Sequence, residues 1–103
     1  MIVAKYIYDY NCHFCQFLEP YIEQLEIFDD VRVRKVEYNN TMELKTGLPC
    51  FIVNDVHIAP EVTISLMLAV EMYPNLFKDI ESPIDMLRYV LKNPKELPNK
   101  YKM

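Results

Sequence analysis

The feature that most constrains this chain is an apolar, strand-like run that leads almost directly into a helical pattern opening with two cysteines. Residues 2–8 are mainly β-branched and aromatic, and Cys12-His13-Phe14-Cys15 follows shortly after them. A strand that feeds the start of a helix places Cys12 where unpaired backbone N–H groups and the helix dipole stabilise a thiolate. Cys15 lies one turn later, close enough to attack any mixed disulfide that forms on Cys12. The pattern is typical of a two-electron thiol–disulfide pair.

Two other interpretations of the same four residues remain open. A C-x-x-C pair is also half of many zinc sites, but a closed site needs four ligands. Only His13, Cys50 and His57 are further candidates, and the chain has no second C-x-x-C. An inert motif is the third interpretation. Because a C-x-x-C beside a β–α–β pattern favours redox chemistry, we expect catalysis by Cys12 and Cys15, with no metal and no bound cofactor.

Length and charge restrict the class of protein. The chain has 103 residues, enough for one domain with a buried core, and a net charge of −4. Residues 1–91 contain 7 Lys and Arg against 14 Asp and Glu, whereas residues 92–103 contain four Lys and one Glu. An acidic body of this kind argues against nucleic-acid binding, because phosphate recognition needs clustered basic side chains.

The chain shows no pattern typical of a signal peptide or a membrane span. The first apolar run is short, contains Lys5 and has no basic region before it, and the later run Val62–Val70 is too short to cross a bilayer. We therefore expect a cytoplasmic protein that does not bind membranes. In a reducing compartment a C-x-x-C pair is more often redox-active or metal-binding than a structural disulfide.

Residue periodicity predicts an alternation of strands and helices. Pro20 falls inside the first helix, and Asn54-Asp55 between two short apolar runs indicates a hairpin turn. The predicted strands are residues 2–8, 31–38, 50–53 and 56–58, and the predicted helices are residues 12–28, 40–47, 62–73 and about 83–92. A right-handed crossover makes the first two strands parallel, and the hairpin adds an antiparallel pair. The sequence therefore predicts an α/β fold, a mixed four-stranded sheet with helices on both faces.

This order, with C-x-x-C at the first strand–helix junction, resembles the thioredoxin-like superfamily over residues 1 to about 60. Pro20 lies five residues after Cys15, where thioredoxins carry the proline that kinks their active-site helix. Gly47-Leu48-Pro49, just before the hairpin, occupies the place of the family's cis-proline loop. The resemblance implies a cis bond before Pro49 and a substrate-binding loop formed by Leu48 and Pro49.

The chain also departs from both main branches of that superfamily. Thioredoxins place Trp before the first cysteine and Gly-Pro between the pair, whereas Asn11 precedes Cys12 here and the chain has no tryptophan. Glutaredoxins commonly hold glutathione with a basic residue before the motif and a Gly-Gly after the hairpin. Here Asp9 leads into the motif and Ala59-Pro60-Glu61 follows the hairpin. We therefore expect glutathione to be a poor partner.

The sequence assigns the following roles. Cys12 is the nucleophile and Cys15 the resolving thiol of a redox disulfide, with His13 and Phe14 as tuning residues between them. His13 is either an electrostatic aid to the thiolate or a solvent-facing residue, and Phe14 either shields the sulfurs or belongs to the core. Cys50 is a buried apolar side chain or a third redox thiol.

We thus expect a small thiol–disulfide oxidoreductase that exchanges electrons with protein disulfides and with a separate reductant. The alternative is a binding or regulatory module of the same fold, with a vestigial or metal-holding C-x-x-C. Residues 1–92 are expected to form a thioredoxin-like domain, and residues 93–103 an irregular basic tail.

Overall fold

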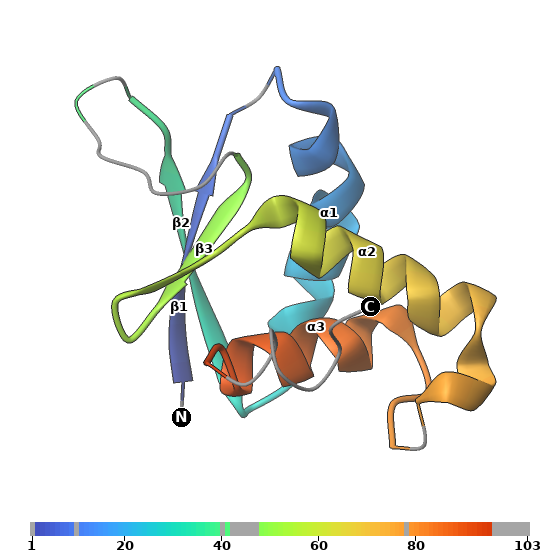
Figure 1. Ribbon diagram of the computed structural model, residues 1–103. Coiled ribbons are helices and arrows are strands. Elements are labelled where there is room, and N and C mark those ends of the chain that lie inside the picture. Colours follow the sequence, from blue (N-terminus) through green and yellow to red (C-terminus); the bar gives the residue numbers. More distant parts are fainter. Residues whose placement is uncertain (1, 10, 40, 42–47, 78, 96–103) are drawn as a thin grey trace.

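The computed structural model describes residues 2–9, 11–39, 41, 48–77 and 79–95 of the chain. Its elements follow the predicted alternation closely (Figure 1). The strands are β1 (Ile2–Tyr8), β2 (Val31–Glu37), β3 (Cys50–Val53) and β4 (Val56–Ile58), and the helices are α1 (His13–Leu25), α2 (Pro60–Met72), the 3₁₀ turn η1 (Pro74–Leu76) and α3 (Pro83–Lys92).

The four strands form one mixed sheet in the order β2-β1-β3-β4. β1 pairs with β2 in parallel and with β3 in antiparallel fashion, and β3 pairs with β4 through the predicted hairpin. Asn54 and Asp55 both adopt positive φ, as a two-residue hairpin turn requires. The predicted mixed four-stranded α/β sheet, with residues 2–8 as a central strand, is therefore confirmed.

One face of the sheet carries the core. Ala4, Tyr6, Phe51 and Val53 are almost fully buried on that face, and α1, α2 and α3 lie to one side of the sheet (Figure 1). Each helix contributes an apolar stripe to this core, formed by Leu18, Ile22 and Leu25 of α1, Leu66, Met67 and Val70 of α2, and Met86, Leu87, Val90 and Leu91 of α3. The helical spacing of these residues in the sequence is what places them together.

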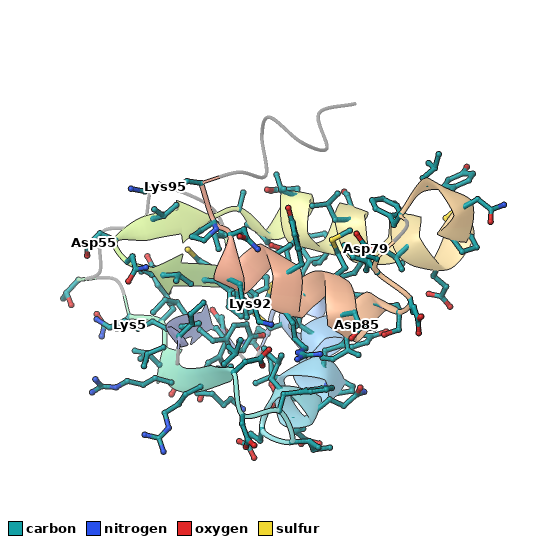
Figure 2. The ribbon with its side chains drawn as sticks, turned by 90° about the horizontal axis from the view of Figure 1, so that it is seen from below. Lys5, Asp55, Asp79, Asp85, Lys92 and Lys95 are labelled. Atoms are coloured by element: carbon teal, nitrogen blue, oxygen red, sulfur yellow. The ribbon has the colours of Figure 1, made fainter. Side chains whose placement is uncertain are left out.

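The opposite face of the sheet is open at several described positions. Val3 is 53% exposed, and Lys5 and Arg34, which are register partners, are also exposed. Figure 2 shows Lys5 pointing away from the helices. A further helix is predicted over residues 40–47. Most of that segment lies outside the described residues, so helices on both faces of the sheet stay a prediction.

Two helix boundaries differ from the predicted ones by two residues or more. α1 ends at Leu25 rather than at residue 28, because Glu26, Ile27 and Phe28 each donate to a carbonyl three residues back, which tightens the chain into turns. α2 begins at Pro60, two residues earlier than predicted. Proline is favoured at the first position of a helix, because its fixed φ suits the helix and its missing N–H would have no partner there.

The second half of α3 and the turn before β2 are joined by ion pairs. Asp30 accepts from Arg88 at 2.6 Å and also pairs with Lys92, and the Arg88 guanidinium lies 3.9 Å from the centre of the Phe28 ring. Figure 2 shows Lys92 and Asp85 on α3. α3 ends at Lys92, and the predicted tail from residue 96 onward lies outside the described residues.

None of the helices in the described part of the chain is both long enough and apolar enough to span a membrane.

Candidate active site

Three segments converge at the carboxyl end of β1. β1 delivers the chain to residues 9–12 and α1 begins there, while the antiparallel pairing of Ile7 with Cys50 places the entry to β3 at the same end of the sheet (Figure 1). The segment just before β3 contains Leu48 and Pro49. The sheet topology therefore brings Leu48, from a distant part of the sequence, next to the two cysteines of the motif.

Cys12 is the N-cap residue of α1. Its backbone is extended, with φ −90° and ψ 125°, and its carbonyl accepts from Gln16 at 3.2 Å, so the helix starts directly after it. No side chain caps this helix start and its first turn carries no acidic residue. The partly exposed sulfur of Cys12 therefore lies at a helix end whose N–H groups and dipole favour negative charge.

Cys15 is the buried member of the pair, with only 5% of its surface exposed. Its side chain makes hydrogen-bond contact with that of Cys12, and the backbone N–H of Asp9 donates to its sulfur at 3.4 Å. Burial raises the pKa of the Cys15 thiol to about 11; the neighbouring Cys12 adds to this increase, and the Asp9 N–H opposes it. Near neutral pH, Cys15 is therefore held as a thiol.

Leu48 and Pro49 close the site on its other side. The Leu48–Pro49 peptide bond is cis, in agreement with the expectation from the sequence resemblance. The Cys12 thiol donates to the Leu48 carbonyl at 3.6 Å, so the carbonyl of the loop directly faces the exposed sulfur. Gly47, the first residue of the predicted loop, lies outside the described residues.

The two residues between the cysteines both point outward. The His13 side chain is exposed, which fits the solvent-facing interpretation and leaves an electrostatic role possible. Phe14 is 50% exposed, so the alternative that placed it in the core is wrong. A first-turn position just after the N-cap faces solvent in α1, because the core-facing stripe of this helix runs through Cys15, Leu18 and Ile22.

Asp9 and Tyr6 were missed by the sequence reasoning. The Asp9 carboxylate accepts from the backbone N–H of Asn11 at 3.0 Å and its carbonyl accepts from that of Cys12 at 3.1 Å, which fixes the turn into α1. The Tyr6 hydroxyl donates to the carbonyl of Cys15 at 3.5 Å. The alternation of β1 puts Tyr6 on the core face, but only the packing of α1 shows that its hydroxyl meets Cys15.

Cys50 is fully buried on β3, as a small apolar residue would be. Its thiol donates to the Phe51 carbonyl at 3.6 Å and lies 3.9 Å from Nδ1 of His57 on the neighbouring strand. Its register partner Ile7 belongs to the sheet face opposite α1. Burial favours the packing interpretation of Cys50 over a third redox thiol.

A cavity of about 210 Å³ opens beside the buried sulfur. It is lined by Tyr8, Asp9, Cys15, Gln16 and Glu19. Glu19 pairs with Lys35 of β2, and the Lys35 ammonium lies 5.1 Å from the centre of the Tyr8 ring. The cavity gives solvent and protons a route to Cys15. A larger cavity of about 330 Å³ lies at the turn between α1 and β2, away from the cysteines.

Among the described residues, no three His, Cys, Asp or Glu side chains gather closely enough to hold a metal ion. The candidate site is thus a pair of thiols with unequal exposure. A backbone carbonyl lies beside the thiol of Cys12, and a tyrosine and a backbone N–H lie beside Cys15.

Comparison of the chain with protein-family models, with curated proteins and with solved structures finds no match.

Proposed function

We propose that this protein is a thiol–disulfide oxidoreductase with a thioredoxin-like fold, acting on disulfides of other proteins. The observation that carries the proposal is the arrangement of Cys12 and Cys15. One sulfur is partly exposed at a helix N-terminus, and the other is buried one turn later and in contact with it. Two thiols so placed suit the two successive steps of disulfide exchange.

Support for the thioredoxin-like fold comes from the order of the elements and from the site itself. A parallel β1–β2 pair, antiparallel β1–β3 and β3–β4 pairs, and a cis Leu48–Pro49 bond facing the C-x-x-C all fit the sequence resemblance. Pro20 also lies within the helix that begins at the motif.

The proposed cycle has two exchanges. The Cys12 thiolate attacks one sulfur of a substrate disulfide, a Cys12–substrate disulfide forms, and the other substrate sulfur leaves as a thiolate that takes up a proton. Cys15 then loses its proton and attacks Cys12, which forms the Cys12–Cys15 disulfide and releases the second substrate thiolate. The substrate gains two electrons and the protein dithiol loses them. A separate dithiol reductant returns the pair to its starting state by the reverse exchanges.

The surroundings of Cys12 favour a polypeptide substrate. Half-exposed Phe14 offers an apolar contact beside the outer sulfur, and Leu48 presents a backbone carbonyl on the opposite side. The sequence lacks the basic residue that precedes the motif in glutaredoxins, and Asp9 stands there instead. Glutathione is therefore expected to be the poorer partner.

Insulin reduction tests the proposal. With a dithiol as the electron source, the wild-type chain is expected to accelerate precipitation of the insulin B chain, and Cys12→Ser to abolish the acceleration because the attacking sulfur is gone. Cys50→Ala is the matched control, and its rate is expected to stay within about twofold of wild type because that thiol is packed inside. Equal turnover by wild type and Cys12→Ser would instead favour a binding module.

A further inference from the structure

Tyr6 places a hydroxyl group against the resolving cysteine from inside the core. The side chain is fully buried on β1. Its ring is stacked on that of Tyr8, with the ring centres 5.8 Å apart, and tilted against that of Phe51, with the centres 5.1 Å apart. Its hydroxyl donates to the Cys15 carbonyl at 3.5 Å, and the nearby Cys15 side chain, after burial, contributes to the raised pKa of Tyr6.

A phenylalanine would fill this position without the cost of burying a hydroxyl group. Burial, followed by the proximity of Cys15, raises the pKa of Tyr6 well above its usual range, so the hydroxyl keeps its proton. A tyrosine that cannot ionise is a permanent donor whose O–H can rotate between two acceptors. Here the acceptors are the carbonyl oxygen and the sulfur of the same residue.

We propose that Tyr6 is a positioning residue for the release step, donating a hydrogen bond to the Cys15 thiolate as it forms. The inference rests on the proposed disulfide exchange through Cys12 and Cys15. With Cys15 as a thiol, the hydroxyl points at the backbone carbonyl. When Cys15 loses its proton, the hydroxyl turns to the sulfur and joins the Asp9 N–H, so the buried thiolate has two donors.

The chemistry of the step remains that of thiol–disulfide exchange. The proton of Cys15 leaves to solvent in the adjoining cavity, the thiolate attacks Cys12, and the bond between Cys12 and the substrate sulfur breaks. Tyr6 neither gains nor loses a proton. The other titratable or charged groups that face this position are Cys12, Asp9, Tyr8, and Glu19 with its partner Lys35. None of them is changed by substitution of Tyr6.

The test uses dithiobis(nitrobenzoate), an aromatic disulfide that releases a coloured thiolate at each exchange, in less than one equivalent per full-length chain. Attack by Cys12 gives a first phase, and release by Cys15 gives a second, intramolecular phase. In Tyr6→Phe the first phase is expected to stay within about twofold of wild type. The second is expected to slow about tenfold, the ratio typical of one hydrogen bond to a charged group, and its pH midpoint to rise by about one pH unit.

Tyr21→Phe on α1 is the matched control, because it removes the same hydroxyl group from a partly buried tyrosine elsewhere in the chain. Its two phases are expected to match wild type. Equal second phases in wild type and Tyr6→Phe would overturn the role of Tyr6 while leaving the proposed function intact. A wild-type chain that gives only the first phase would instead refute the proposed function.

A second variant keeps the inference testable if Tyr6→Phe does not fold. A ring-fluorinated tyrosine placed at position 6 preserves the shape of the side chain and makes its hydroxyl a stronger donor. The second phase is then expected to accelerate and its pH midpoint to fall. An unchanged rate and midpoint in this variant would also overturn the inference.

Discussion

At the scale of single residues, the two cysteines of the motif differ in solvent exposure, although they lie only one helical turn apart. Cys12 precedes the first helical residue and keeps part of its sulfur exposed, whereas Cys15 lies on the stripe that packs against β1. Burial raises the pKa of Cys15 to about 11, so this residue is held as a thiol near neutral pH. The same two residue types thus take different roles through their surroundings.

Brief treatment with substoichiometric iodoacetamide is expected to modify Cys12 first. The physical reason is that alkylation needs an accessible thiolate, and Cys15 and Cys50 are both buried. Peptide mapping by mass spectrometry would locate the label, and the same treatment after denaturation should label all three cysteines. Preferential labelling of Cys15 or Cys50 in the folded chain would reverse the assignment of the nucleophile.

At the scale of elements, helix ends decide what the helices can do. α1 starts without a side-chain cap, so no side chain accepts from the terminal N–H groups next to Cys12. α3 starts with a full capping arrangement, in which the Ser82 hydroxyl accepts from the Asp85 N–H at 3.4 Å and donates to the Asp85 carboxylate at 2.9 Å. The uncapped helix carries the site, and the capped helix supports the core behind it.

Removing the cap of α3 is expected to lower stability without changing the chemistry. In Ser82→Ala the Asp85 N–H loses its partner, and the free energy of unfolding is expected to fall by about 1 kcal/mol, the usual cost of losing a serine cap. Urea unfolding followed by circular dichroism would measure the loss. Ser82→Asn, which restores a capping oxygen, should recover most of it, and insulin reduction should be unchanged in both variants.

At the scale of the whole molecule, a cluster of ion pairs around Asp30 joins α3 to the turn before β2, away from the motif. Hydrogen bonds from Arg88, and then from Lys92, lower the pKa of the Asp30 carboxyl to about 2. Because this pKa lies below that of an ordinary carboxyl group, the cluster stabilises the fold at neutral pH and this contribution is lost as the pH falls toward about 2. Side chains about a third exposed are screened by solvent, so the gain is modest.

Asp30→Asn is therefore expected to reduce stability near neutral pH by less than about 1 kcal/mol, with the difference from wild type vanishing in strong acid. Urea midpoints measured across the acid range would show the two curves converge as the pH falls. Asp29→Asn, the neighbouring exposed position, removes the same charge outside the cluster and should leave the midpoint nearly unchanged. A constant difference between Asp30→Asn and wild type at every pH would contradict the role of the carboxylate.

The sequence by itself determined the elements and the place of the motif. Alternating and helical periodicities located the strands and three of the helices to within a few residues, because buried stripes need those spacings. It also placed Cys12 at a helix start, because a strand-like run ends just before a helical one. The errors fell at helix ends, where local hydrogen bonds at Glu26 to Phe28 and a favoured proline position at Pro60 outweighed the periodicity.

Only the tertiary structure decided which distant groups meet at the motif. The pairing of β1 with β3 brings the Leu48 carbonyl to Cys12, and the packing of α1 on β1 brings the Tyr6 hydroxyl and the Asp9 N–H to Cys15. These contacts depend on the sheet order and on the direction from which a helix crosses the sheet. Neither leaves a local pattern in the sequence, because contacts between distant segments arise from the packing of whole elements rather than from the spacing of neighbouring residues.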